Sequence, residues 1–262
     1  MSTNEQTVLV VAHPGHELRV FGWMERTRPC VFVITDGAGR LGNPRVNSTG
    51  SLLRQTGATR GTFFGNISDT KAYQSILSRD YDAFASMAND LTSYLLSRPI
   101  SYVVADAFEG YNPLHDMCRL IVNAAVKAAS KYTYIANYAF TLQGKPEPRS
   151  KENLPNSIRL HLDDDVFARK MHAARNYPGL MNEIENALEV TDQESFRVEY
   201  LWPQEDDDLA TWFKDQKPFY ERFGEQQVSS GHYQEVIRFR QHLLPFAELL
   251  KTHTPRVTQE TY

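Results

Sequence analysis

Short apolar runs alternate with helical patterns through the first half of this sequence, and this alternation is the strongest constraint on its fold. The runs are rich in β-branched residues and too short for helices, which is typical of strands buried on both faces of a parallel sheet. They span residues 7–12, 31–35, 62–64, 100–105 and 134–140. Because strands that alternate with helices form βαβ units, the sequence predicts an α/β fold with a mostly parallel sheet and helices on both faces.

Apolar residues at helical spacing predict the intervening helices, at residues 17–25, 48–57, 81–96 and 114–130. A segment rich in Pro, Lys and Glu at 143–157 indicates a linker or a long loop. Beyond it the patterns are mainly helical. They predict helices at residues 163–177, 179–188 and 232–250, with one strand at 196–202. We expect a core over residues 1–145 and a C-terminal extension over 146–262, packed together as one compact unit.

Composition excludes several classes of protein. The formal net charge of −4 argues against a basic face for duplex nucleic acid. Two cysteines, Cys30 and Cys118, are too few for a disulfide scaffold, and their apolar surroundings predict small buried side chains in a reducing compartment. No signal peptide or membrane span is recognisable. We therefore expect a cytoplasmic protein that acts on a small molecule, without a nucleic-acid or membrane partner, and a homo-oligomer remains an open alternative.

Three histidines follow predicted strands of the same sheet. His13 comes directly after the first strand, His16 lies three residues later, and His115 follows the fourth strand. Ligands of open parallel sheets bind beyond the carboxyl ends of the strands, so these side chains are expected to meet there. Imidazole is a common ligand for zinc and also suits iron, nickel and cobalt. The pattern predicts a divalent-metal site, with Zn²⁺ as the first choice.

At these residues the sequence resembles the PIG-L/LmbE-like deacetylases. Residues 12–17 read Ala-His-Pro-Gly-His-Glu, where the family has Ala-His-Pro-Asp-Asp-Glu. Further pieces are Thr35-Asp36-Gly37, Gly57-Ala58, Asn66-Ile67-Ser68-Asp69 and Glu109-Gly110-x-Asn112-Pro113-x-His115-Asp116. The resemblance covers residues 7–140. It implies a Rossmann-like domain that uses zinc to hydrolyse N-acetyl groups of amino-sugar conjugates.

Matched position by position, the resemblance assigns His13 and His115 as metal ligands. His16 stands where the family has a ligating Asp, so the implied site holds three histidines. A neutral ligand in place of an anion makes the ion a stronger Lewis acid. Gly15 stands where the family has the Asp that serves as general base, and Asn112 replaces a His of the second motif.

Because Gly15 cannot accept a proton, another carboxylate must serve as base or catalysis is lost. The candidates are Glu17, Asp36, Asp106 and Asp116, of which Asp106 and Glu17 are preferred as catalytic groups. Asp36 and Asp116 are expected to hydrogen-bond the metal ligands from behind.

Substrate contacts are expected from Arg45, Asp69 and Asn112. Further cations near the predicted rim are Arg19, Arg40 and Arg119. The sequence thus predicts a metal-dependent hydrolase of an N-acyl bond, most simply N-deacetylation of an amino sugar or a similar conjugate. Two alternatives stay open: a relative that binds metal or ligand as a binding or scaffold subunit without catalysis, and another metal-centred reaction such as deformylation or ester cleavage.

Overall fold

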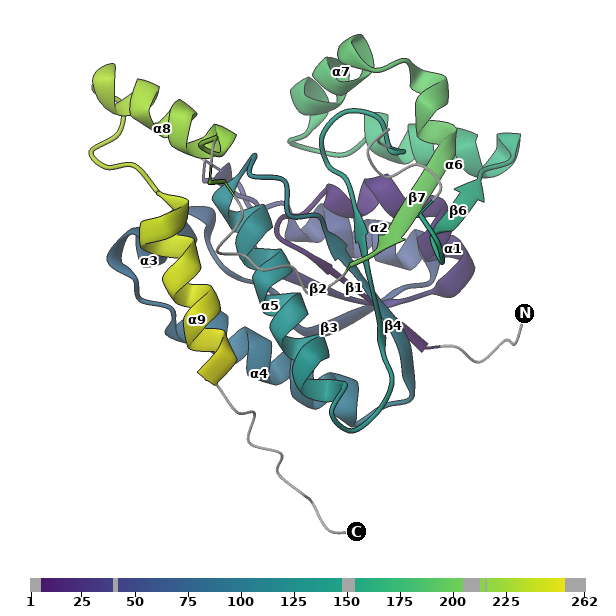
Figure 1. The fold of residues 1–262 in the computed structure, drawn as a ribbon. Helices are drawn as coiled ribbons and strands as arrows, with labels where there is room; N and C mark the ends of the chain where they lie inside the picture. Colours follow the sequence, from purple (N-terminus) through teal and green to yellow (C-terminus); the bar gives the residue numbers. More distant parts are fainter. Residues whose placement is uncertain (1–5, 40–41, 148–153, 205–212, 215, 253–262) are drawn as a thin grey trace.

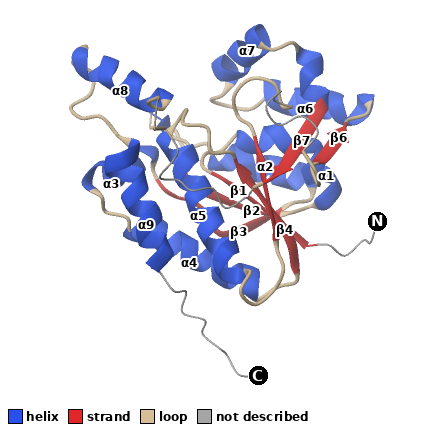
Figure 2. Cartoon of the chain, viewed as in Figure 1, coloured by secondary structure: helices blue, strands red, loops and turns tan. Residues whose placement is uncertain are grey.

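The described strands form one sheet in the order β3-β2-β1-β4-β5-β7-β6 (Figures 1 and 2). This computed structural model describes residues 6–39, 42–147, 154–204, 213–214 and 216–252. The strands are β1 (Gln6–Val11), β2 (Cys30–Thr35), β3 (Thr59–Ile67), β4 (Ile100–Asp106), β5 (Ala136–Phe140), β6 (Ile158–His161) and β7 (Val198–Pro203). β1 to β5 run parallel, whereas β7 is antiparallel to β5 and to β6. The predicted α/β fold with a mostly parallel sheet is confirmed.

Helices cover both faces of the sheet, as expected. The described helices are α1 (Phe21–Thr27), α2 (Val46–Thr56), α3 (Asp69–Ser78), α4 (Asp82–Leu96), α5 (Pro113–Ala129), α6 (Asp164–Arg175), α7 (Met181–Val190), α8 (Phe219–Ser229) and α9 (Leu244–Thr252). Successive residues of β1 point to opposite faces. Val8 and Val10 pack among α3, α4, α5 and α9, while Leu9 and Val11 pack among α1 and α2.

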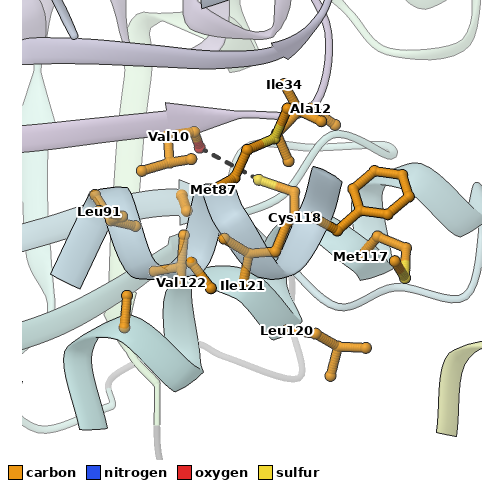
Figure 3. Packing of buried hydrophobic residues seen from close by; sticks show 14 of the residues in the cluster. Val10, Ala12, Ile34, Met87, Leu91, Met117, Cys118, Leu120, Ile121 and Val122 are labelled. Carbon is orange, nitrogen blue, oxygen red and sulfur yellow. Dashed lines mark hydrogen bonds between the residues drawn. The ribbon is translucent and has the colours of Figure 1, made fainter. Parts of the chain in front are cut away.

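The interior between β1 and α5 is apolar and close-packed (Figure 3). Cys118 of α5 lies against β1, with its Sγ 3.7 Å from the carbonyl oxygen of Val10. Cys30 is buried as well, and both cysteines are free thiols. The two side chains therefore fill space in the core, as their apolar surroundings predict.

The first predicted helix is divided in two. Residues 16–20 form a 3₁₀ turn, η1 (His16–Val20), and α1 follows it. The carboxylate of Glu199 in β7 accepts hydrogen bonds from the backbone N–H groups of Gly22 and Trp23, at 2.9 and 2.7 Å. A distant carboxylate thus satisfies the first N–H groups of α1, which a local pattern does not reveal.

The predicted helix at 232–250 is wrong in its first part. Helical structure begins only with the π-helical turn η6 (Phe239–Leu243), which leads into α9. Arg238 has extended backbone angles, and its N–H donates to Nδ1 of His242 at 2.8 Å. Pro245 has no N–H for an i→i−4 bond, which favours the wider turn before α9. The helices α3 and α8 and the strand β6 were not predicted.

The C-terminal residues extend the sheet as well as covering it. β7 pairs with β5, and β6 pairs with β7, so two antiparallel strands complete one edge. Between them in sequence lie α6, α7 and the 3₁₀ turn η4 (Gln193–Arg197). In the described part of the chain, no helix is both long and apolar enough to cross a membrane.

Candidate metal centre

Three imidazole rings meet at the carboxyl edge of the sheet. His13 lies in the turn after β1, His16 opens η1, and His115 lies in the first turn of α5. The ring centre of His13 is 5.3 Å from those of His16 and His115, and the latter two are 4.6 Å apart. The rings pack edge to face. The structure therefore brings together the three histidines that the sequence singled out.

His13 is held from behind by polar groups of β2 and α3. Its Nδ1 lies 2.7 Å from Oγ1 of Thr35 and 3.0 Å from Oδ1 of Asp69. Burial of Asp69 would raise the pKa of its carboxyl, but the hydrogen bond and charge of His13 hold this pKa below its usual range. The other Asp69 oxygen accepts from the N–H of Gly39. Asp69, which the sequence predicts to contact substrate, hydrogen-bonds a histidine of the cluster.

His16 is held by Asp106 at the end of β4. Its Nδ1 lies 2.8 Å from Oδ2 of Asp106, and the same oxygen accepts the N–H of Ala12 at 2.8 Å. An Nδ1–H that donates to a carboxylate leaves the Nε2 lone pair free to bind a metal. Burial raises the pKa of Asp106 to about 7, while the Ala12 hydrogen bond and His13 act in the opposite direction.

Nδ1 of His115 is buried. Among the described residues, no hydrogen-bond partner is found for its Nδ1. Burial lowers the pKa of His115 well below its ordinary value, with a further contribution from His16. Burial likewise lowers the pKa of His16, with contributions from His13 and Arg45. Both rings are therefore neutral near pH 7, the form that binds metals.

The three ring separations can be compared with those expected around a divalent ion. A Zn–N distance of about 2.1 Å places each imidazole centre about 3.2 Å from the ion, so tetrahedral ligands have ring centres about 5 Å apart. The observed separations of 4.6–5.3 Å match this value. Within the described ranges, however, no group of three or more His, Cys, Asp or Glu side chains is arranged so that it could hold a metal ion. Hydrogen bonds at Nδ1 of His13 and of His16 leave Nε2 as the free nitrogen of each ring.

The remaining predicted carboxylates accept hydrogen bonds from other protein groups, although Oδ2 of Asp116 has no partner among the described residues. Glu17 is buried and accepts hydrogen bonds from the N–H of Gly15 and the hydroxyl of Tyr177. Asp116 is buried, and one of its oxygens accepts two N–H groups of the loop after β4. Asp36 accepts from the N–H groups of Ala38 and Asp69. In the described part of the chain, neither Asp36 nor Asp116 forms a hydrogen bond with any of the three histidines.

The predicted substrate residues Asn112 and Arg45 differ in how their polar atoms are hydrogen-bonded to the protein. Asn112 caps α5 through the N–H of Leu114 and also bonds the hydroxyl of Tyr73. Arg45 donates from Nη1 to the carbonyl of Gly179, whereas its buried Nε has no partner among the described residues. Arg45 therefore keeps one buried guanidinium nitrogen that is not bonded to any described residue.

The structure describes two of the three other arginines that were predicted near the rim of the site. Arg19 donates to the carbonyl groups of Leu142 and Gly144. Arg119 is fully buried and donates to the carbonyls of Ala105 and Asp106 in β4 and of Tyr138 in β5, so it is not part of a rim. Arg40 lies outside the described residues.

Leu180, which sequence reasoning missed, lies where a side chain at residue 15 would project. Gly15 has φ +109°, and a Cβ placed on it would lie 2.1 Å from Cδ1 of Leu180. Leu180 belongs to the segment between α6 and α7, far away in sequence. No local sequence pattern predicts this contact, because an apolar residue before a helix has many possible partners.

Comparison with known proteins supports the fold. No protein-family model matches the sequence, and a search of curated proteins finds no match either. The crystal structure of the A40926 pseudoaglycone deacetylase aligns with a TM-score of 0.52 and 16% identity, over 76% of this chain and 96% of that one. A deacetylase complex from teicoplanin biosynthesis aligns with a TM-score of 0.46 and 13% identity, over 78% and 100%. A zinc-inhibited form of teicoplanin deacetylase aligns with a TM-score of 0.41 and 12% identity, over 78% and 100%. At 16% identity, the first of these likenesses shows a shared fold.

Proposed function

We propose that this chain is a metal-dependent hydrolase of the PIG-L/LmbE-like type, which removes an acetyl group from the nitrogen of an amino sugar or a similar small conjugate. The observation that carries the proposal is the cluster of His13, His16 and His115 at the carboxyl edge of the sheet. Two of these rings are backed by buried carboxylates, an arrangement that orients metal ligands. The fold shared with a solved deacetylase agrees with this activity.

In this proposal the three histidines would hold the divalent ion, with Zn²⁺ as the first choice. When bound, the ion supplies a Lewis acid for the acyl carbonyl and lowers the pKa of water. Asp69 and Asp106 fix the ring orientations of His13 and His16. Three neutral histidines would leave the charge of a divalent ion unbalanced, and the two carboxylates would offset part of that charge.

Arginine side chains near the cluster would position the substrate. Arg45 and Arg19 both act electrostatically on His16. The spare Nε donor of Arg45 suits a carbonyl or hydroxyl oxygen of a bound conjugate. Asn112 and Asp69 bind other protein groups, so we assign substrate contact first to Arg45.

A second candidate function is a relative that binds metal and ligand without hydrolysing an amide. The observation in its favour is the pairing of Gly15 with Leu180. The space where the family's base would project is filled by an apolar side chain. Binding would then survive while the usual proton transfer at that position is lost.

Metal content tests the site itself. After equilibration with Zn²⁺ and removal of excess ion, we expect about one bound ion per chain by elemental analysis. His13→Ala, His16→Ala and His115→Ala each remove a ligand, and each is expected to lose stoichiometric metal. His161→Ala, which alters an exposed residue of β6, is the matched control and retains it. Full metal retention in all three cluster variants would show that the site is wrong.

Acetate release separates the two candidate functions. The metal-loaded protein is incubated with N-acetylglucosamine conjugates, and acetate is measured with and without a chelator. Release that chelation abolishes and His115→Ala removes supports the hydrolase. Stoichiometric metal without release across a panel of N-acyl conjugates supports the binding protein instead.

A further inference from the structure

A positively charged pocket lies between the segment before α8 and the turn η6. Its volume of about 370 Å³ lies in the range of pockets that hold small ligands. Four of its lining residues are cations, namely Lys214, Lys217, Arg238 and Arg240. Among the described residues that line it, none belongs to the histidine cluster or to the loop after β4. The pocket is therefore separate from the candidate metal centre.

Contacts between α8 and η6 hold the walls of this pocket in place. The carboxylate of Glu221 in α8 accepts the backbone N–H of Phe239 in η6 at 2.7 Å. The ring centre of Phe239 lies 5.2 Å from that of Phe213, which precedes α8. Phe239 is buried, so this contact belongs to the core. The backbone on both sides of the pocket is thus fixed, which lowers the entropic cost of binding a ligand there.

Two of the four cations are already paired with carboxylates. Glu225 of α8 lies 2.7 Å from Nζ of Lys217 and also 2.7 Å from Nη1 of Arg238. Glu221 lies 3.5 Å from the same nitrogen of Arg238. These four side chains form an alternating network of two positive and two negative charges, so together they are neutral.

The other two cations leave the pocket with a positive charge. Lys214 and Arg240 form no side-chain hydrogen bond and no ion pair with any described residue. Four cations against two carboxylates leave two positive charges at the pocket. The whole chain, by contrast, has a formal net charge of −4. This concentration of unpaired positive charge in a pocket indicates an anionic ligand.

The groups that line the pocket suit a phosphate group in particular. A guanidinium binds two phosphate oxygens through parallel N–H donors, and an ammonium adds a point charge. A phosphate monoester carries about −1.5 to −2 charges near pH 7, which matches the two unpaired cations, whereas a carboxylate supplies one negative charge. Gln216 and Gln241 also line the pocket, and the amide nitrogen of each is a further donor.

We infer that this pocket binds the phosphate group of a small molecule, with Arg240 and Lys214 as its charged contacts. Neither residue takes part in the proposed function, so the inference stands independently of it. Lys214 precedes α8 and Arg240 belongs to η6, so the two cations come from opposite walls of the pocket. A bound phosphate group would therefore join the two walls.

Titration calorimetry on the full metal-loaded chain tests the pocket, with inorganic phosphate and glycerol 3-phosphate as probes. We expect saturable binding of one phosphate group per chain, and added NaCl weakens it because the cations are exposed to solvent. Tighter binding of glycerol 3-phosphate identifies an ester as the ligand. Equal or tighter binding of inorganic phosphate identifies the free ion, and either result supports the pocket.

Arg240→Gln is expected to weaken phosphate binding about tenfold, because a charge-assisted hydrogen bond is lost. Arg240→Gln combined with Lys214→Gln is expected to abolish it, whereas Arg240→Lys keeps the charge and part of the affinity. Both side chains are exposed, so these variants are expected to keep the melting temperature of the parent chain without phosphate. Arg54→Gln, which alters an exposed arginine of α2, is the matched control.

Several outcomes overturn the phosphate pocket. These are no saturable binding of either probe, or an affinity that the double variant leaves unchanged. Binding that His115→Ala abolishes and Arg240→Gln leaves unchanged overturns it as well, because the phosphate is then at the histidine cluster. Binding that appears only after the acidic run at residues 205–208 is replaced by amides assigns the two cations to that run instead.

Discussion

At the scale of single residues, the burial of Asp106 indicates which chemical role its carboxylate has. The sequence suggested it as a general base because it ends a strand at the edge where ligands bind. In the structure it is fully buried and bonds Nδ1 of His16. That position suits a carboxylate that orients a ligand, whereas a base needs direct or water-mediated access to the substrate.

Asp106→Asn distinguishes these two roles. If Asp106 orients His16, the variant binds metal about 10–100-fold more weakly but keeps nearly full kcat once saturated with metal. If Asp106 is the base, metal affinity stays unchanged and kcat falls by roughly 10²–10⁴-fold. We expect the first result. Metal titration and acetate release on the same samples give both quantities, with the exposed Asp82→Asn as control.

At the scale of elements, the connection between α6 and α7 is built into the candidate site. The hydroxyl of Tyr177 lies 2.7 Å from Oγ1 of Thr49 and donates to Glu17 at 3.2 Å. The carbonyl of Gly179 accepts from Arg45, and Leu180 packs against Gly15. A segment of the C-terminal part therefore shapes the turn that carries His13 and His16.

An Asp at residue 15, where the PIG-L/LmbE-like deacetylases have one, is expected to destabilise this chain. Gly15→Asp combines a left-handed φ with a 2.1 Å approach to Leu180, so we expect a loss of about 2–4 kcal/mol in the free energy of unfolding. Adding Leu180→Ala removes the clash and recovers part of that loss. Gly231→Asp, at φ +73° with open space around it, costs about 1 kcal/mol or less. Urea titration compares the variants, and equal stability of Gly15→Asp and Gly231→Asp contradicts the packing argument.

At the scale of the whole molecule, one buried ion pair connects the C-terminal part to the N-terminal helices. Nζ of Lys170 in α6 lies 2.8 Å from Oε1 of Glu199 in β7, and both side chains are almost fully buried. Nζ also donates to the carbonyl of Arg19. Burial lowers the pKa of Lys170, with Glu199 acting in the opposite direction. Because Glu199 also caps α1, the pair connects α6, β7 and α1.

Lys170→Met leaves the Glu199 carboxylate buried without its cation, so we expect the free energy of unfolding to fall by about 3–5 kcal/mol. Lys170→Met with Glu199→Gln removes the charge but keeps an acceptor for the α1 amides, and recovers part of this loss. Lys251→Met breaks an exposed pair with Glu248 and costs less than about 1 kcal/mol. Chemical denaturation followed by circular dichroism gives the three values. A loss no larger than that of Lys251→Met would contradict the role of the pair.

Much of this architecture follows from local pattern. Continuous apolar runs predict β1, β2 and β4, because only strands buried on both faces carry them in a chain of this kind. His13 and His115 follow such strands, so their meeting at one edge of the sheet follows from the parallel topology. The sequence by itself therefore determined the fold class and the composition of the histidine cluster.

Only the tertiary structure decided what surrounds that cluster. Asp69 lies behind His13, Leu180 fills the space at Gly15, and Phe219 stacks on Tyr111. Each contact joins segments far apart in the chain. Periodicity reports which face of an element is apolar, but the partner on that face is selected by packing of the whole molecule. The sequence thus predicted the three histidines, whereas the residues that contact them were decided by the tertiary structure.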